Sequence, residues 1–391
     1  MAAAGPQGAA APQGSAATAA VAPAPGVENA DELLTAGQWR LILLRFLRHR
    51  MAVAAGIVVL LFYLAAVFVE FVAPYDPHVR DTTHISAPPM RLRVWDVEER
   101  RLHARPFVYG TTLRRDPVTL QRIYVADTSI RLPLRLLVRG DEYRLLGFIP
   151  ARLHLFGFDG DERGTLLGTD TQGRDLLSRI IYGTRISLTI GFVGVALSFG
   201  LGITLGAISG YFGGLADMVI QRIIEVLIAI PSLPLWMALS AAIPFDWPQT
   251  RTFFLITVIL SLTGWPGMAR VVRGKLLSLR DEDFVLAARI DGARGGRVMF
   301  RHLVPSFLSH IIASATLAIP GMILGETALS FLGIGLRSPA ISWGVLLQEA
   351  QNIQAVALMP WLLLPGAFVV VAVLAFNFLG DGLRDAADPY A

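Results

Sequence analysis

Six stretches of the chain are long and apolar enough to cross a lipid bilayer, for which about 20 residues are needed. They lie at residues 51–72, 186–208, 218–241, 252–272, 307–332 and 355–379. Of the 391 residues, 54% are hydrophobic and 16% are charged, so the chain is more apolar than a typical soluble domain. The pattern predicts an all-α integral membrane protein with six transmembrane helices.

Basic residues in the short loops predict the orientation, because Lys and Arg gather on the cytoplasmic side. One basic group precedes the first span and comprises Arg40, Arg45, Arg48 and Arg50. A second group, between the fourth and fifth spans, comprises Arg270, Arg273, Lys275, Arg280, Arg289, Arg294, Arg297 and Arg301. An even number of crossings separates the groups, so we expect both termini in the cytoplasm and a multi-pass protein of a bacterial-type inner membrane. The net charge of +4 is explained by this orientation, and we expect no nucleic-acid partner.

The remaining segments predict the domain organisation. Residues 1–36 are rich in Ala, Pro and Gly, which predicts a disordered cytoplasmic tail. Residues 37–74 predict an interfacial helix and the first transmembrane helix, and residues 75–180 an extracytoplasmic insert that ends in another interfacial helix. Residues 181–391 then form a five-helix core with a cytoplasmic loop at 274–305.

The insert contains runs of strand-forming residues, LRVWDV, FVYG, RIYVAD and LRLLVRG, separated by Asp, Gly and Pro. These runs predict a small, mostly β domain between the first two transmembrane helices. Two interpretations remain open: the domain decorates the outer face, or it is a contact surface for a soluble partner.

The end of the insert, residues 168–187, mixes charged and apolar residues. This mixture predicts a helix lying at the outer interface, with Asp175 and Arg179 paired at i,i+4 spacing. Such a helix either packs on the bundle as a structural element or contacts the substrate.

The cytoplasmic loop has a helical pattern of its own. Asp281, Glu282 and Asp283 suit a helix start, and Gly292 suits its end, because glycine enters the left-handed region without penalty. The face between them is small and partly apolar and consists of Phe284, Ala287, Ala288 and Asp291. Gly295 and Gly296 are expected to extend the break, and Pro305 to begin a new helix. The alternative is an ordinary basic loop with a short surface helix.

Polar or helix-breaking residues within spans are candidate gating positions, because charges in a bilayer are rare. Glu225 follows Arg222 by one turn and is expected to pair with it, and Pro231, with Pro234, is expected to break the third span. Pro266 is expected to kink the fourth span. Glu326 either lines a polar path or hydrogen-bonds across helices. The small residues of the second span predict close helix packing; they are Ala196, Gly200, Gly202, Gly206, Ala207 and Gly210.

Several kinds of site are absent from the sequence. The chain has no cysteine, which excludes disulfides, zinc thiolate sites and iron–sulfur clusters. It has no G-x-x-x-x-G-K-[ST] phosphate loop, and its seven histidines are scattered without metal-ligand spacing. We therefore expect no metal, no cofactor and no catalytic residue in this chain.

Short motifs in a fixed order carry a family resemblance. Ala287-Ala288, Gly292 and His302-Leu303-Val304-Pro305 resemble the EAA motif of ABC importer permeases, with Leu286 where that motif usually has glutamate. Four further motifs accompany the spans: Ala73-Pro74-Tyr75-Asp76-Pro77, Leu167-Gly168-Thr169-Asp170, Glu326-Thr327-Ala328-Leu329-Ser330-Phe331-Leu332-Gly333 and Gly380-Asp381-Gly382-Leu383-Arg384-Asp385. Together they resemble the second permease subunit of dipeptide, oligopeptide and nickel ABC importers.

The resemblance implies a type I ABC importer permease fold and a non-catalytic membrane subunit. Its implied partners are a homologous permease, two ABC ATPase subunits that use ATP, an extracytoplasmic substrate-binding protein and membrane lipid. Coupling to the ATPases is implied for Phe284, Leu286, Ala287, Ala288, Asp291, Gly292, Arg301, His302 and Pro305. Peptides are the implied cargo, with nickel or another small solute as the alternative. Functions of other classes are an ion-coupled secondary transporter or a membrane scaffold.

Overall fold

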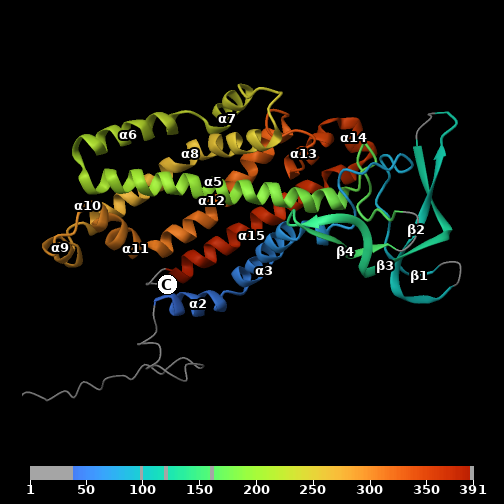
Figure 1. The fold of residues 1–391 in the computed structure, drawn as a ribbon, viewed down its shortest axis with the longest axis horizontal. Coiled ribbons are helices and arrows are strands. Elements are labelled where there is room, and N and C mark those ends of the chain that lie inside the picture. The colour runs from blue at the N-terminus through green and yellow to red at the C-terminus, as the bar shows by residue number, and fades with distance from the viewer. Residues whose placement is uncertain (1–37, 97–99, 119–121, 159–162, 388–391) are drawn as a thin grey trace, which may run out of the picture.

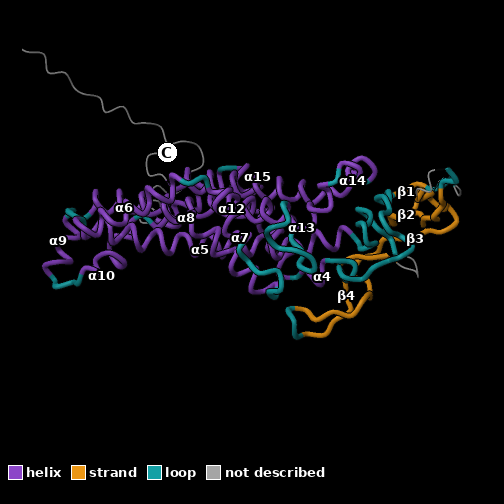
Figure 2. The backbone as a smooth tube through the Cα atoms, turned by 90° about the horizontal axis from the view of Figure 1, so that it is seen from above, coloured by secondary structure: helices purple, strands orange, loops and turns teal. Residues whose placement is uncertain are grey.

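The computed structural model describes residues 38–96, 100–118, 122–158 and 163–387. The tail predicted at 1–36 lies outside these residues. The described residues form an elongated helical bundle with a β domain at one end and the short helix α9 (Asp283–Ile290) at the other (Figures 1 and 2).

The bundle helices are α2 (Gln38–Arg48), α3 (Arg50–Val67), α4 (Val69–Val72), α5 (Leu176–Phe212), α6 (Gly214–Ala229), α7 (Ser232–Ala241), α8 (Gln249–Leu279), α12 (Leu308–Phe331) and α15 (Leu364–Ala387). Between α9 and α12 lie α10 (Gly295–Arg297), the π-helix η1 (Val298–Leu303) and α11 (Val304–Ser306). Between α12 and α15 lie α13 (Trp343–Gln348), η2 (Glu349–Gln351), α14 (Ile353–Leu358) and η3 (Pro360–Leu363).

Five helices of the described residues are long and apolar enough to span a membrane, namely α3, α5, α8, α12 and the stretch Pro360–Ala387. A sixth span requires counting α6 and α7 together, although they meet at an angle of 87°. The break lies at Pro231, as predicted, because proline has no N–H to donate and forces the preceding Ile230 into extended backbone. Pro234 does not break the chain again; it lies in the first turn of α7.

Glycines hold α5 against α8. A Cβ added at Gly202, Gly206 or Gly210 would lie 2.8, 2.5 or 2.9 Å from a carbonyl oxygen of α8. The predicted close packing is therefore confirmed for these three positions. Gly200 differs, because nothing lies within 4 Å of its Cβ position.

The interfacial helix predicted at 168–187 is wrong. Residues from Leu176 onward are the first turns of α5, which continues without a break to Phe212 over 37 residues. At 1.5 Å per residue such a helix is about 55 Å long, well beyond the hydrocarbon thickness of about 30 Å. Its polar first turns therefore continue the long helix α5 and do not form a separate helix.

The insert forms the β domain, confirming the prediction of a small β-rich element. Its strands are β1 (Arg93–Trp95), β2 (Leu102–Arg115), β3 (Arg122–Leu145) and β4 (Ile149–Phe158), all antiparallel in the order β1-β2-β3-β4. Met90, Val108, Leu132 and Phe158 form its small buried core. The four predicted runs lie in β1, β2 and β3, with the last two joined in one long strand, and β4 was not predicted.

Candidate functional site

The loop between α8 and α12 presents α9 at the end of the bundle farthest from the sheet (Figure 1). Val285 and Ala288 are buried and hold α9 on the structure, Val285 in a cluster with Leu276 of α8 and Leu303 of η1. The opposite face is apolar and exposed: Ile290 is 85% accessible, and Leu286 43%. One face therefore anchors the helix, and the other lacks a covering within the described residues.

The predicted bounds of this helix are confirmed. Glu282 precedes the first turn of α9, and Gly292 follows its last with a φ of +79°. Pro305 lies in the first turn of α11, as predicted, but helical backbone already resumes at Gly295, so the expected extension of the break by Gly295 and Gly296 is wrong. A Cβ at Gly295 would lie 3.0 Å from the ring of Tyr211 on α5, so glycine there lets the new helix start close to α5 rather than extending the break.

The structure brings the predicted coupling residues together along one segment with different exposures. Exposed positions are Phe284, Leu286, Ala287, Asp291, Gly292, Arg301 and Pro305. His302 is half-buried and Ala288 is buried, so Ala288 holds the helix in place instead of facing a partner.

Glu326 is the centre of a buried polar cluster. Its carboxylate accepts hydrogen bonds from Ser330 on its own helix at 2.8 Å, Ser342 before α13 at 2.6 Å and Ser187 on α5 at 3.3 Å. Ser187 in turn accepts the backbone N–H of Trp343 at 3.2 Å. Of the two interpretations offered for Glu326, the structure supports hydrogen bonding across helices.

Replacing Glu326 with alanine should destabilise the bundle by roughly 1–3 kcal/mol, because three buried serine hydroxyls lose their acceptor. Glu326→Gln keeps one carbonyl oxygen and should fall between the alanine variant and the parent. Thermal unfolding in detergent measures the order. Equal loss from both variants would show that the carboxylate charge, rather than its acceptor geometry, holds the helices.

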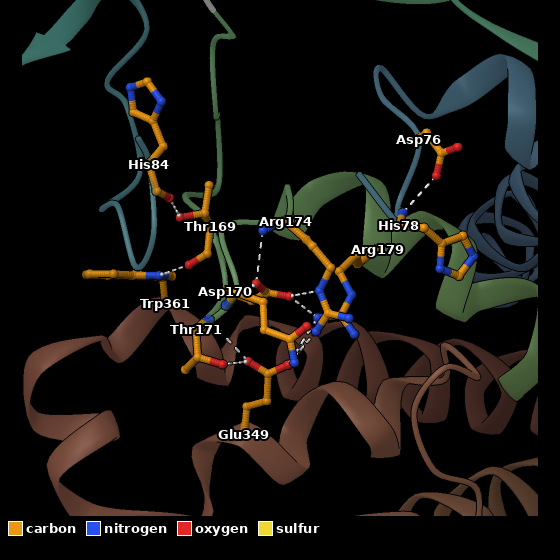
Figure 3. A network of polar contacts seen from close by, with 11 residues as sticks. Asp76, His78, His84, Thr169, Asp170, Thr171, Arg174, Arg179, Glu349 and Trp361 are labelled. Carbon is orange, nitrogen blue, oxygen red and sulfur yellow. Dashed lines mark hydrogen bonds and ion pairs between the residues drawn. The ribbon is translucent and has the colours of Figure 1, made fainter. Parts of the chain in front are cut away.

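A second polar cluster lies where the insert joins α5 (Figure 3). Asp170 is fully buried and accepts hydrogen bonds from Arg174 Nε at 2.6 Å and from Arg179 Nη1. Both arginines also contact Glu349 Oε1, at 3.2 Å and 3.0 Å, and Glu349 Oε2 accepts the Thr171 hydroxyl at 2.9 Å. The cluster ties the start of α5 to η2.

The predicted pairing of Asp175 with Arg179 is wrong. Asp175 is the N-cap of α5 and accepts the backbone N–H and the hydroxyl of Ser178 at 2.8 Å and 2.7 Å. Burial raises the pKa of Asp175 to about 6, although these two hydrogen bonds favour the charged form. Glu349 was missed in the sequence because it lies 170 residues from Arg179, and helical spacing reveals only local partners.

The other intramembrane candidates have different surroundings. Glu225 pairs with Arg222 at 3.1 Å on the exposed face of α6, as predicted. Pro266 is buried within α8, beside the position where Gly202 of α5 approaches the carbonyl of Trp265. The kink expected at Pro266 stays a prediction.

Comparison with known proteins identifies the class of this bundle. Residues 202–390 match the family model of the binding-protein-dependent transport system inner membrane component, and residues 37–89 match the N-terminal TM domain of oligopeptide transport permease C. The dipeptide transport system permease protein DppC of Alkalihalophilus pseudofirmus is 41% identical over 223 residues, which cover 57% of this chain and 71% of the relative. The chain belongs to the family of ABC peptide importer permeases.

A second relative agrees with this assignment, and one solved structure is similar in part. The oligopeptide transport system permease protein OppC of Escherichia coli K12 is 42% identical to the permease over 229 residues, 58% of this chain and 73% of the relative. A solved structure of the MetNI methionine ABC transporter in inward-facing conformations covers 53% of the permease and 95% of its own chain, with a TM-score of 0.41 and 20% identity.

The insert lies between the two ranges that match family models. The two matched ranges leave residues 90–201 of the permease between them, and these contain all four strands. With several apolar helices and this family, the permease is a multi-pass protein of the inner membrane.

Proposed function

We propose that this permease imports dipeptides or oligopeptides as one half of an ATP-driven translocation pathway. A homologous permease supplies the other half, and two ABC ATPases drive the cycle. The proposal draws its substrate class from relatives that are dipeptide and oligopeptide permeases. One observation supports coupling to the ATPases: the short helix α9 is anchored on one face and is apolar and exposed on the other.

The anchoring of α9 provides a mechanical link. Val285 lies in one buried cluster with Leu276, near the end of α8, and with Leu303 at the end of η1, which leads through α11 into α12. A partner that pulls on α9 therefore pulls on two membrane-spanning helices at once. Closing and opening of the ATPases would favour different positions of α9, which is the differential contact that a switch between two conformations requires.

The orientation follows from the same assignment. The α9 end carries the basic group between the fourth and fifth spans and faces the cytoplasm, where ATP is available. The β domain at the other end then faces outward and offers a surface to an extracytoplasmic substrate-binding protein.

A pulldown of the tagged permease from membranes in mild detergent tests the docking site. With the parent chain we expect both ATPase subunits and the second permease to co-purify. Ala287→Glu combined with Gly292→Pro should abolish ATPase recovery, because the first substitution puts a charge on the docking face and proline cannot adopt the φ of +79° found at Gly292.

The matched control is Val118→Glu, which places the same charge on a highly accessible turn of the β domain. It should leave ATPase recovery unchanged. Normal ATPase recovery with the double variant, while the second permease also co-purifies, would refute docking through α9.

A further inference from the structure

The β3–β4 hairpin ends in an exposed apolar turn. Leu146, Phe148 and Ile149 are 47%, 71% and 44% accessible, and they form a contiguous tip. This hairpin stands apart from the rest of the sheet (Figure 2). Exposing three large apolar side chains to water is unfavourable, so we expect another apolar surface to cover the tip.

The turn geometry does not explain these residues. Leu146 and Gly147 have φ values of 53° and 86°, and Phe148 donates its backbone N–H to Leu145 at 3.3 Å. Two positive φ values in a row are typical of a hairpin turn that prefers Asn or Asp before Gly. Leucine in that position carries a steric penalty, so its apolar side chain must be favoured by something other than the turn.

The tip lies at the outer end of the first transmembrane helix. Leu146 lines one cavity with Tyr63 and Val67 from the last two turns of α3 and with Arg185 of α5. The hairpin is fixed there by His154, whose Nδ1 lies 2.6 Å from the carbonyl oxygen of Ala73. The position of the tip is therefore set by the span itself.

Two observations set the level of the tip relative to the bilayer. Below it, α3 presents an apolar exposed face to its surroundings, comprising Ile57, Leu60, Leu61, Leu64 and Val67. Beside it, Arg185 pairs with Glu70 at 2.6 Å, and such a charged pair belongs at the polar boundary of a membrane. The tip thus lies where hydrocarbon gives way to headgroups.

The side chains on the two strands of the hairpin suit the boundary between hydrocarbon and headgroups. Arg139, Arg144 and Arg152 are exposed on its two strands, Arg152 paired with Glu142, and Tyr143 is half-buried near the tip. Arginines bind lipid phosphates, and aromatic side chains gather at the interface, while apolar tips enter the acyl region. This combination favours lipid over a protein partner as the covering.

We propose that the turn at residues 146–149 inserts into the outer leaflet of the bilayer. There it holds the β domain of the permease against the membrane surface. The insertion fixes the height and tilt of that domain independently of any soluble partner.

The permease has no cysteine, so an introduced cysteine is unique in this chain, and any cysteine of the partner subunits is replaced before labelling. A nitroxide is attached to Phe148→Cys, and separately to Ile149→Cys, in the assembled importer held in nanodiscs of phosphatidylcholine and phosphatidylglycerol. Val118→Cys, at the β2–β3 turn and 88% accessible, is the matched control. Relaxation of each nitroxide by oxygen, which concentrates in lipid, and by a water-soluble nickel chelate is then compared.

We expect oxygen to relax both tip nitroxides several times more effectively than the chelate, with the opposite ranking for the control. Strong relaxation by the chelate would place the tip in water and overturn the proposal. Weak relaxation by both reagents would show a protein covering, such as the second permease, and would also overturn it. Gel filtration of each labelled variant establishes that the importer is assembled.

Discussion

Replacing Gly206 with leucine should prevent α5 and α8 from packing in the membrane. A Cβ at this position would lie 2.5 Å from the carbonyl oxygen of Ala269, and backbone cannot yield as a flexible side chain does. The helices must separate, so we expect a loss of roughly 3 kcal/mol or more of stability. The measurement is the temperature at which half of the detergent-solubilised protein remains monodisperse.

Gly200→Leu is the matched control on the same helix. Nothing lies within 4 Å of a Cβ there, and leucine is the better helix former. This variant should be as stable as the parent. If both leucine variants behaved alike, the close approach of α5 and α8 would not be a determinant of the fold.

Replacing Asp170 with alanine should have the second large effect. Asp170 and Arg179 are almost completely buried, and Arg174 is 6% accessible. Removing the carboxylate leaves two buried arginines with Glu349 alone, and breaking a buried ion pair in this way costs about 3–5 kcal/mol. Asp170→Asn should lose less, because an amide oxygen still accepts the backbone N–H groups of Gln172 and Arg174.

Thermal unfolding of Asp170→Ala and Asp170→Asn measures which variant loses more stability. The control is Asp281→Ala, which removes an exposed ion pair with Arg280 and should change little. An alanine variant at Asp170 as stable as the parent would mean that the cluster does not hold the insert to the bundle.

Much of the bundle is predictable because its physics is local along the chain. A bilayer requires an apolar run of a given length, so five of the six runs correspond to helices that could span it. The break at Pro231 and the left-handed Gly292 also follow from single residues, because proline cannot continue a helix and glycine enters the left-handed region without penalty. The same local physics explains why α9 has the bounds expected for it.

The errors arise where distant parts of the chain meet. Residues 168–187 resemble an interfacial helix because charged and apolar residues are mixed along them, with opposite charges at helical spacing. Glu349, far along the chain, accepts hydrogen bonds from Arg174 and Arg179. This partner allows the polar residues at the start of α5 to be buried while the helix continues without a break. Likewise, β4 was missed because its pairing with β3 is set by the hairpin register rather than by its own alternation.

The central claim is that ATP hydrolysis in partner subunits drives import through this permease. It is tested most directly by peptide uptake into proteoliposomes that hold the purified assembly with ATP in the lumen and a peptide-loaded binding protein outside. We predict uptake with ATP and none with a non-hydrolysable analogue or with the Ala287→Glu, Gly292→Pro permease. Uptake that continues without ATP and follows an imposed ion gradient would contradict the account and identify the chain as a secondary transporter.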